Sequence, residues 1–160
     1  MNDLLNTEPV KRVIEALSKF NKNLKVQILE KTARTARDAA TALNCAEGAI
    51  VKSLVFRSGE GFLVCLVSGD KKCSLNKVKK LVFQKDVCMG NAEDVKAQTG
   101  FTIGGVSPVG HLKELDILID KNLNRFDQVF AAAGHPNSIF EIDFSMLIDL
   151  TRGRIEDITE

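Results

Sequence analysis

The 160-residue chain has few of the residues on which metal and redox chemistry often depend. It has two histidines, and its four cysteines, at positions 45, 65, 73 and 88, form no C-x-x-C pair. Zinc sites and redox motifs both need such residues at short, regular spacings. The sequence therefore supports neither, and we expect no metal and no cofactor. We expect the thiols of Cys45 and Cys65 to be buried.

Long apolar runs and a net charge of one sign are also missing. No run approaches the roughly 20 apolar residues that span a bilayer, and the first residues, MNDLLNTEPVK, lack the basic-then-apolar design of a signal peptide. Lys and Arg number 22 against 21 acidic residues, so there is no global basic signature of a nucleic-acid binder. We expect a cytoplasmic protein with one domain over residues 1–160.

The chain does carry clear signals of mixed secondary structure. Helical spacing and capping residues predict helices at about 8–21, 36–43, 74–83, 91–100 and after Asp143 or Ser145. Apolar, β-branched segments predict strands at 26–29, 49–56, 62–67, 86–89, 115–119, 128–133 and 138–142, and one at the C-terminus. The segments at 49–56 and 62–67 read as a hairpin at the centre of the sheet. This order predicts an α+β or mixed α/β fold.

The segment Phe101–His111, FTIGGVSPVGH, is the strongest candidate for a functional loop. It is not a P-loop, because His111 and Leu112 stand where that motif needs Lys and Ser or Thr. It is not a nucleophile elbow either, because Gly105-x-Ser107 continues into Pro108-Val109. A simple structural turn is the plain alternative. As a functional loop it would present the backbone N–H groups of Gly104 and Gly105 to a carbonyl oxygen that gains negative charge.

Lys52 lies inside an apolar strand, AIVKSLVF. Burying an ammonium without a partner is costly, so this lysine either faces solvent or lines a polar pocket. Strand alternation places it on the face of Ile50 and Leu54, opposite the face of Ser53. This arrangement favours a pocket, in which Lys52 would bind a phosphate or carboxylate.

Three further features could contribute to a site. His135 lies in a turn between Gly134 and Pro136, and Asp120 ends a predicted strand, where helix capping is its alternative role. Arg34 precedes a helix start that could attract anions. Six lysines in fifteen positions, at 71, 72, 77, 79, 80 and 85, form a basic patch that is either a solvated helix face or an RNA contact.

Taken together, these segments resemble the YbaK and prolyl-tRNA-synthetase-associated editing domains. The resemblance runs from about residue 25 to the end, through TARTARDAATAL, IVKSLVF, LVSGD, TGFTIGGVSPVGH, LDILID and FDQVFAAAGHPNSIFEI. It implies a curved, barrel-like mixed sheet flanked by helices. It also implies hydrolysis of the ester that joins a wrong amino acid to transfer RNA.

The resemblance also assigns roles to residues. It implies that Lys52 acts near the terminal adenosine and the reacting ester, and that Gly104 to Pro108, including Ser107, form the G-x-x-x-P loop that holds the substrate carbonyl. His135 matches the histidine of a G-H-P motif. Further matches are expected to bind substrate; they are Ser53, Asp120 and Gly134. For the transfer RNA itself we expect contacts from Arg34, Lys71, Lys72, Lys77, Lys79 and Lys80.

The G-H-P form resembles the branch that removes alanine or similar small residues from proline transfer RNA. The cysteine-clearing branch differs at Ala131–Pro136, so the resemblance does not extend to cysteine specificity. We therefore expect a free-standing aminoacyl-tRNA deacylase, with prolyl-tRNA synthetase as a candidate partner. The alternatives are a non-catalytic module that binds transfer RNA or a synthetase, and a small-molecule hydrolase on the same scaffold.

Overall fold

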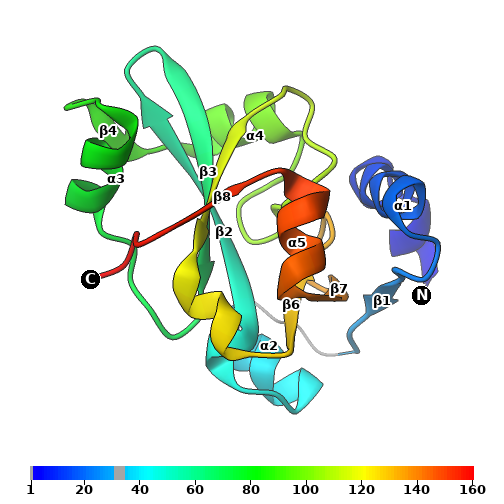
Figure 1. The fold of residues 1–160 in the computed structure, drawn as a ribbon. Coiled ribbons are helices and arrows are strands. Elements are labelled where there is room, and N and C mark those ends of the chain that lie inside the picture. The colour runs from blue at the N-terminus through cyan, green and yellow to red at the C-terminus, as the bar shows by residue number, and fades with distance from the viewer. Residues whose placement is uncertain (1, 31–34) are drawn as a thin grey trace.

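The computed structural model describes residues 2–30 and 35–160, and within these ranges a mixed β-sheet carries helices on both faces (Figure 1). The α-helices are α1 (Glu8–Phe20), α2 (Ala36–Leu43), α3 (Leu75–Val82), α4 (Ala92–Thr99) and α5 (Phe144–Thr151). Short 3₁₀ helices lie at η1 (Asn2–Asn6), η2 (Glu47–Ala49) and η3 (Lys121–Arg125).

Side-chain caps explain where four of the helices begin. The cap residue accepts a hydrogen bond from the backbone N–H three positions later, which satisfies one of the unpaired donors of the first turn. The four cap residues are Thr35, Ser74, Asn91 and Asp143. Before α1, by contrast, the Thr7 hydroxyl donates back to the Leu4 carbonyl and does not cap the helix.

The sheet consists of β1 (Val26–Ile28), β2 (Ile50–Ser58), β3 (Gly61–Ser68), β4 (Val87–Met89), β5 (Asp116–Asp120), β6 (Gln128–Ala132), β7 (Ser138–Asp143) and β8 (Arg154–Glu156). Its order is β1-β7-β6-β2-β3-β5-β8, and β4 also pairs with β2. Since β1 and β8 stand at opposite ends of this order, the sheet is open. The predicted hairpin is confirmed: β2 and β3 pair antiparallel at the centre, from Val51 opposite Ser68 to Ser58 opposite Gly61.

One side of β2 is only partly paired, and this gap positions the candidate site. On that side β6 pairs with residues 50–51 and β4 pairs with residues 56–58. Among the described strands, the four residues between them, 52–55, have a partner only on the β3 side. We call this interval the β2 gap.

Three apolar clusters hold the helices on the sheet. On one face, α1, α4 and α5 pack against Val51 and Val55 of β2. The segment Phe101–His111 before β5, which we call the glycine loop, packs on the same face. On the other face, α3 packs through Val78 on Phe56 and Cys65. Figure 1 shows α3 and α1 on opposite sides of the central hairpin. The third cluster joins α2 to Ile50 at the beginning of β2.

The mixed α/β prediction and the predicted elements are confirmed, with ends that differ by at most two residues. Cys65 is buried as expected, but Cys45 is only half-buried, because it follows the end of α2 near the surface. Within residues 2–30 and 35–160, no helix has the length and the apolar character needed to cross a membrane.

Candidate active site

A cavity of about 660 Å³ occupies the β2 gap. Residues 50–55 of β2 form its floor, and Ala132 of β6 and Met89 of β4 lie at the two ends of the gap. Most of the side chains around it are apolar. Besides residues 50–55, Met89 and Ala132, the cavity lining includes Thr35, Ala36, Arg37, Ala39, Glu47, Gly69, Gly90, Val95, Ile103, Gly104, Val106, Phe130, Ala131, Pro136 and Ile139.

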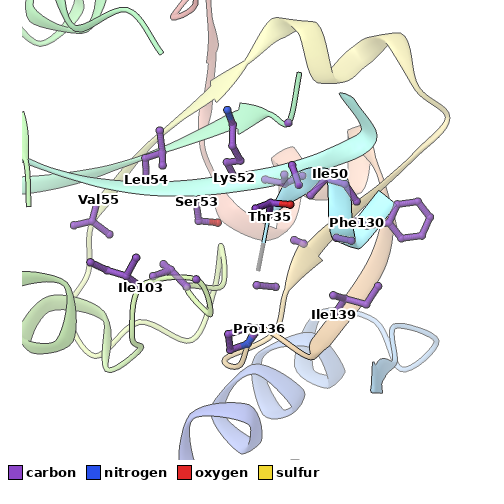
Figure 2. A pocket seen from close by; sticks show the side chains of 18 of the residues that line it. Thr35, Ile50, Lys52, Ser53, Leu54, Val55, Ile103, Phe130, Pro136 and Ile139 are labelled. Carbon is purple, nitrogen blue, oxygen red and sulfur yellow. The ribbon is translucent and has the colours of Figure 1, made fainter. Parts of the chain in front are cut away.

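Lys52 and Ser53 line this cavity from opposite faces of β2, as strand alternation predicts (Figure 2). The Lys52 ammonium points away from the glycine loop and donates to the Lys71 carbonyl at 2.5 Å. That carbonyl comes from the loop after β3, which also lines the cavity through Gly69. A neutral carbonyl leaves the lysine charge unbalanced, so the ammonium is suited to hold an anionic group of a ligand.

The Ser53 hydroxyl is buried and has no hydrogen-bond partner among the described residues. Figure 2 shows Ser53 on the side of β2 that faces Ile103 and Pro136. Burying a polar group without a partner costs free energy, so native structures pair almost all of them. An unpartnered hydroxyl beside a cavity is therefore a candidate contact for a ligand.

The glycine loop brings its backbone to the cavity at Gly104. This residue has φ +94°, a conformation that favours glycine, and a Cβ built on it would lie 3.6 Å from Pro136. Gly105 does not line the cavity: its N–H donates to the Thr102 carbonyl at 2.9 Å, and an added Cβ would lie 2.9 Å from the His135 Cα. Ile103, Gly104 and Val106 line the cavity, and among the described residues no acceptor is found for their backbone N–H groups.

Ser107 and Pro108 form the buried base of the loop and do not reach the cavity lining. The Ser107 hydroxyl accepts from the Val109 N–H at 3.2 Å, and its carbonyl lies 2.7 Å from His111 Nε2. Burial lowers the pKa of His111, so the neutral ring donates to that carbonyl. These bonds hold the loop in shape, and the expected substrate contacts of Ser107 and Pro108 stay predictions.

The turn at Gly134–Pro136 packs beside the glycine loop, but only Pro136 of these three lines the cavity. Gly134 has φ +100°, and an added Cβ would lie 2.9 Å from the Pro9 backbone at the start of α1. His135 accepts the Asn137 N–H on Nδ1 at 3.0 Å. Gly134 therefore supports the turn. The expected contacts of Gly134 and His135 with substrate stay predictions.

Asp120 belongs to a fully hydrogen-bonded polar cluster, and it too lies outside the cavity lining. It is completely buried and accepts the N–H groups of Ser68 and Asn122, both at 2.9 Å. Next to it, Arg125 binds Asp70 at 2.7 Å and the Ser68 hydroxyl at 2.8 Å. We call Ser68, Asp70, Asp120, Asn122 and Arg125 the Asp120 cluster. Its bonds join β3 to η3. They give Asp120 a structural role, and its expected contact with substrate stays a prediction.

The residues predicted to contact transfer RNA differ in their exposure and in their bonding. Lys77 is bound by Asp157 at 3.0 Å and by the Thr159 carbonyl, whereas Lys72 and Lys80 are exposed. Lys71 and Lys79 are half-exposed, and none of these five lysines lines the cavity. Arg34 lies outside the described residues. The role of all six in RNA binding stays a prediction.

The cavity therefore combines apolar walls, the Lys52 ammonium and backbone groups that have no partner within the described part of the chain. Backbone N–H groups aimed into a site of low polarity stabilise an oxygen that gains negative charge. The described lining offers neither a cysteine nor a histidine as a nucleophile. This combination suits the binding and polarisation of an ester carbonyl.

Comparison with known proteins identifies the family. Residues 30–150 match the profile of the aminoacyl-tRNA editing domain. The chain is 35% identical over 135 residues to "Uncharacterized protein YwhH" of Bacillus subtilis, covering 83% of this chain and 85% of that protein. It is 28% identical over 126 residues to "Putative Cys-tRNA(Pro)/Cys-tRNA(Cys) deacylase EbsC" of Enterococcus faecalis, covering 78% of this chain and 77% of that protein.

A solved structure shows the same fold over almost the whole chain. "Crystal structure of a putative trans-editing enzyme for prolyl tRNA synthetase" superposes with a TM-score of 0.91 at 37% identity, covering 96% of this chain and 98% of the other. With the match to the domain profile over most of its length, the chain belongs to the family of aminoacyl-tRNA editing domains.

Proposed function

We propose that this protein is an aminoacyl-tRNA deacylase that acts in trans and removes a small, wrongly attached amino acid from transfer RNA for proline. The observation that carries this proposal is the cavity in the β2 gap, which is lined by Lys52, by Gly104, whose N–H has no acceptor among the described residues, and by apolar side chains. The names of a related deacylase and of a related trans-editing structure support the reaction and the transfer RNA.

The reaction is hydrolysis of an ester. A water molecule adds to the ester carbonyl, the oxygen of the resulting tetrahedral centre takes the negative charge, and the bond to the ribose oxygen then breaks. The proton of the attacking water passes to the departing ribose oxygen, and the neighbouring ribose hydroxyl is positioned to transfer it. The Gly104 N–H stabilises the charged oxygen, while Lys52 holds a phosphate of the terminal nucleotide.

The walls of the cavity support a small substrate side chain. Ala131 and Val106 are buried, and Pro136 closes the cavity beside Gly104. A pocket of this kind excludes larger side chains by steric overlap, but it discriminates weakly against smaller ones. We therefore expect activity on several small residues, with alanine among them.

Replacing Lys52 by alanine tests this function. We expect kcat/KM for an alanyl-tRNA of proline specificity to fall about 10- to 100-fold, because a charge-assisted bond to phosphate is lost. The circular dichroism spectrum and the Tm should stay close to those of the wild type, since the Lys52 side chain bonds to one backbone carbonyl and to no other described residue. Deacylation is measured as loss of labelled alanine from the transfer RNA.

Lys11→Ala is the matched control, because Lys11 is an exposed lysine on α1. It should deacylate at the wild-type rate. Full activity in Lys52→Ala would contradict the role of Lys52. If the wild type bound the transfer RNA without turnover, and salt weakened this binding steeply, the protein would be a binding module and the proposed reaction would be wrong.

A further inference from the structure

The backbone of Ser53 points into the β2 gap. The Val55 carbonyl accepts from the Gly90 N–H at 2.9 Å, so it faces away from β3. Ser68, which stands opposite Val51, donates its N–H to Asp120 and not to β2. Along an antiparallel pair, hydrogen-bonded and non-hydrogen-bonded positions alternate. Because both of these positions are non-hydrogen-bonded, Ser53, midway between them, must also turn its N–H and C=O away from β3.

Ser53 therefore offers three unpaired polar groups on one residue. Neither β6 nor β4 reaches it, and over the described chain no hydrogen bond to its N–H or C=O is found. Its hydroxyl is also buried without a partner. Unpaired groups of this kind are rare in native proteins, which indicates that a ligand completes them.

An aminoacyl group has the same polar atoms as one residue of a β-strand. Its α-nitrogen donates and its carbonyl oxygen accepts, and the two are separated by a single α-carbon. In an antiparallel ladder, opposed residues of a hydrogen-bonded pair exchange two such bonds. Each strand residue spans roughly 3.3 Å, so the four-residue gap has room for one residue and part of the attached ribose.

We propose that the aminoacyl group of the substrate binds in the β2 gap as a one-residue strand, with its α-nitrogen donating to the Ser53 carbonyl and its ester carbonyl accepting from the Ser53 N–H. This proposal rests on the proposed deacylase function and specifies how the site holds its substrate. The Ser53 N–H then joins the Gly104 N–H in stabilising the charged oxygen.

The pairing also fixes where the substrate side chain goes. Directly opposed residues of a strand pair project their side chains to the same face of the sheet. The substrate side chain therefore lies on the Ser53 face, between Val55 and the loop residues Ile103 and Val106, away from the Lys52 ammonium. The Ser53 hydroxyl lies beside it and gives the α-nitrogen a second acceptor.

The direct test varies the α-substituent of the substrate. The same transfer RNA is charged with alanine, with lactate, which has a hydroxyl in place of the α-nitrogen, and with propionate, which has no donor there. Each enzymatic rate is divided by the uncatalysed rate of the same ester, because the ammonium itself makes the ester more labile. We expect this ratio to fall about 10- to 100-fold for the propionyl ester and less for the lactyl ester.

Equal ratios for the alanyl and propionyl esters would overturn the one-residue strand while leaving the deacylase function in place. Absence of turnover on all three esters would instead remove the proposed function. A second readout does not need turnover: an alanyl-adenosine analogue with an amide in place of the ester should shift the Ser53 N–H resonance. An unmoved Ser53 resonance under saturating analogue would also contradict the pairing.

Two serine variants provide a matched pair. Ser53→Ala removes an unpaired hydroxyl, so we expect an unchanged or higher Tm together with a lower kcat/KM for alanyl-tRNA. Ser68→Ala, on the neighbouring strand, removes a hydroxyl that Arg125 binds, so we expect a lower Tm. A drop in Tm for Ser53→Ala with unchanged kcat/KM would show a structural hydroxyl and contradict its role in substrate binding.

Discussion

Two polar regions at the centre of the sheet have opposite hydrogen-bonding states. In the Asp120 cluster, the carboxylate of Asp120 is saturated by Ser68 and Asn122. At the β2 gap, the Ser53 hydroxyl and backbone have no partner in the described structure. Burial alone therefore does not distinguish a functional polar group from a structural one. The difference lies in whether the protein itself supplies the partner.

The variant Asp120→Ala tests this contrast with the largest expected effect. The change removes the carboxylate that accepts the buried Ser68 N–H, so this donor is left without a partner. We therefore expect a loss of about 3 kcal/mol in the free energy of unfolding. Urea denaturation measures the loss. Well below its Tm, the variant should still deacylate alanyl-tRNA, because Asp120 does not line the cavity. Loss of turnover in a folded variant would place Asp120 in the site and break the contrast.

Gly104→Ala tests the cavity side with a smaller expected effect. Its φ of +94° is strained for any residue with a Cβ, so we expect a loss of about 1–2 kcal/mol in the free energy of unfolding. Any relaxation of the backbone would redirect the N–H, so kcat should also fall. Gly61→Ala is the control, since its Cβ would have ordinary room at 3.7 Å and no positive φ is involved. Unchanged kcat in Gly104→Ala would remove this N–H from the reaction.

The smallest effect is expected at the rim of the Asp120 cluster, from Asp70→Asn. The hydrogen bond from Arg125 holds the pKa of Asp70 below its usual value. The unfolded chain therefore binds this proton more readily, and the stability that the pair contributes is present above about pH 4 and is lost as the pH falls below it. Because both side chains are more than one third exposed, we expect under about 1 kcal/mol.

Thermal denaturation of wild type and Asp70→Asn between pH 3 and pH 7 measures this effect. The two Tm curves should converge at the acid end of the range. A constant difference across the range would mean that Asp70 contributes through packing and not through its charge.

The sequence predicts the elements well, because their signals are local. Thr35 and Asn91 are capping residues whose helices begin where the pattern indicates. The opposite faces of Lys52 and Ser53 follow from strand periodicity alone. These features depend on residues a few positions apart, so they can be predicted from a single sequence.

The site itself depends on pairing between distant segments, and this is where the sequence is insufficient. Nothing local in AIVKSLVF shows that the pairing of β2 with β6 ends at residue 51, or that its pairing with β4 begins at residue 56. The same reason explains Gly105, which looked equivalent to Gly104 but uses its N–H within the turn. The hydrogen bond from Ser68 to Asp120 could not be predicted for the same reason, because Ser68 lies 52 residues away along the chain.

The β2 gap also has a consequence for the solubility of the folded chain. A strand with unpaired backbone groups at the outer edge of a sheet is a template on which other chains can add and aggregate. Here the unpaired interval lies between two paired ones, and it is only four residues long. Another strand therefore cannot align along it, whereas a single amino-acid residue can. An internal interruption of the sheet therefore leaves backbone groups free to form hydrogen bonds with a ligand, and it does not create an edge on which another protein chain could pair.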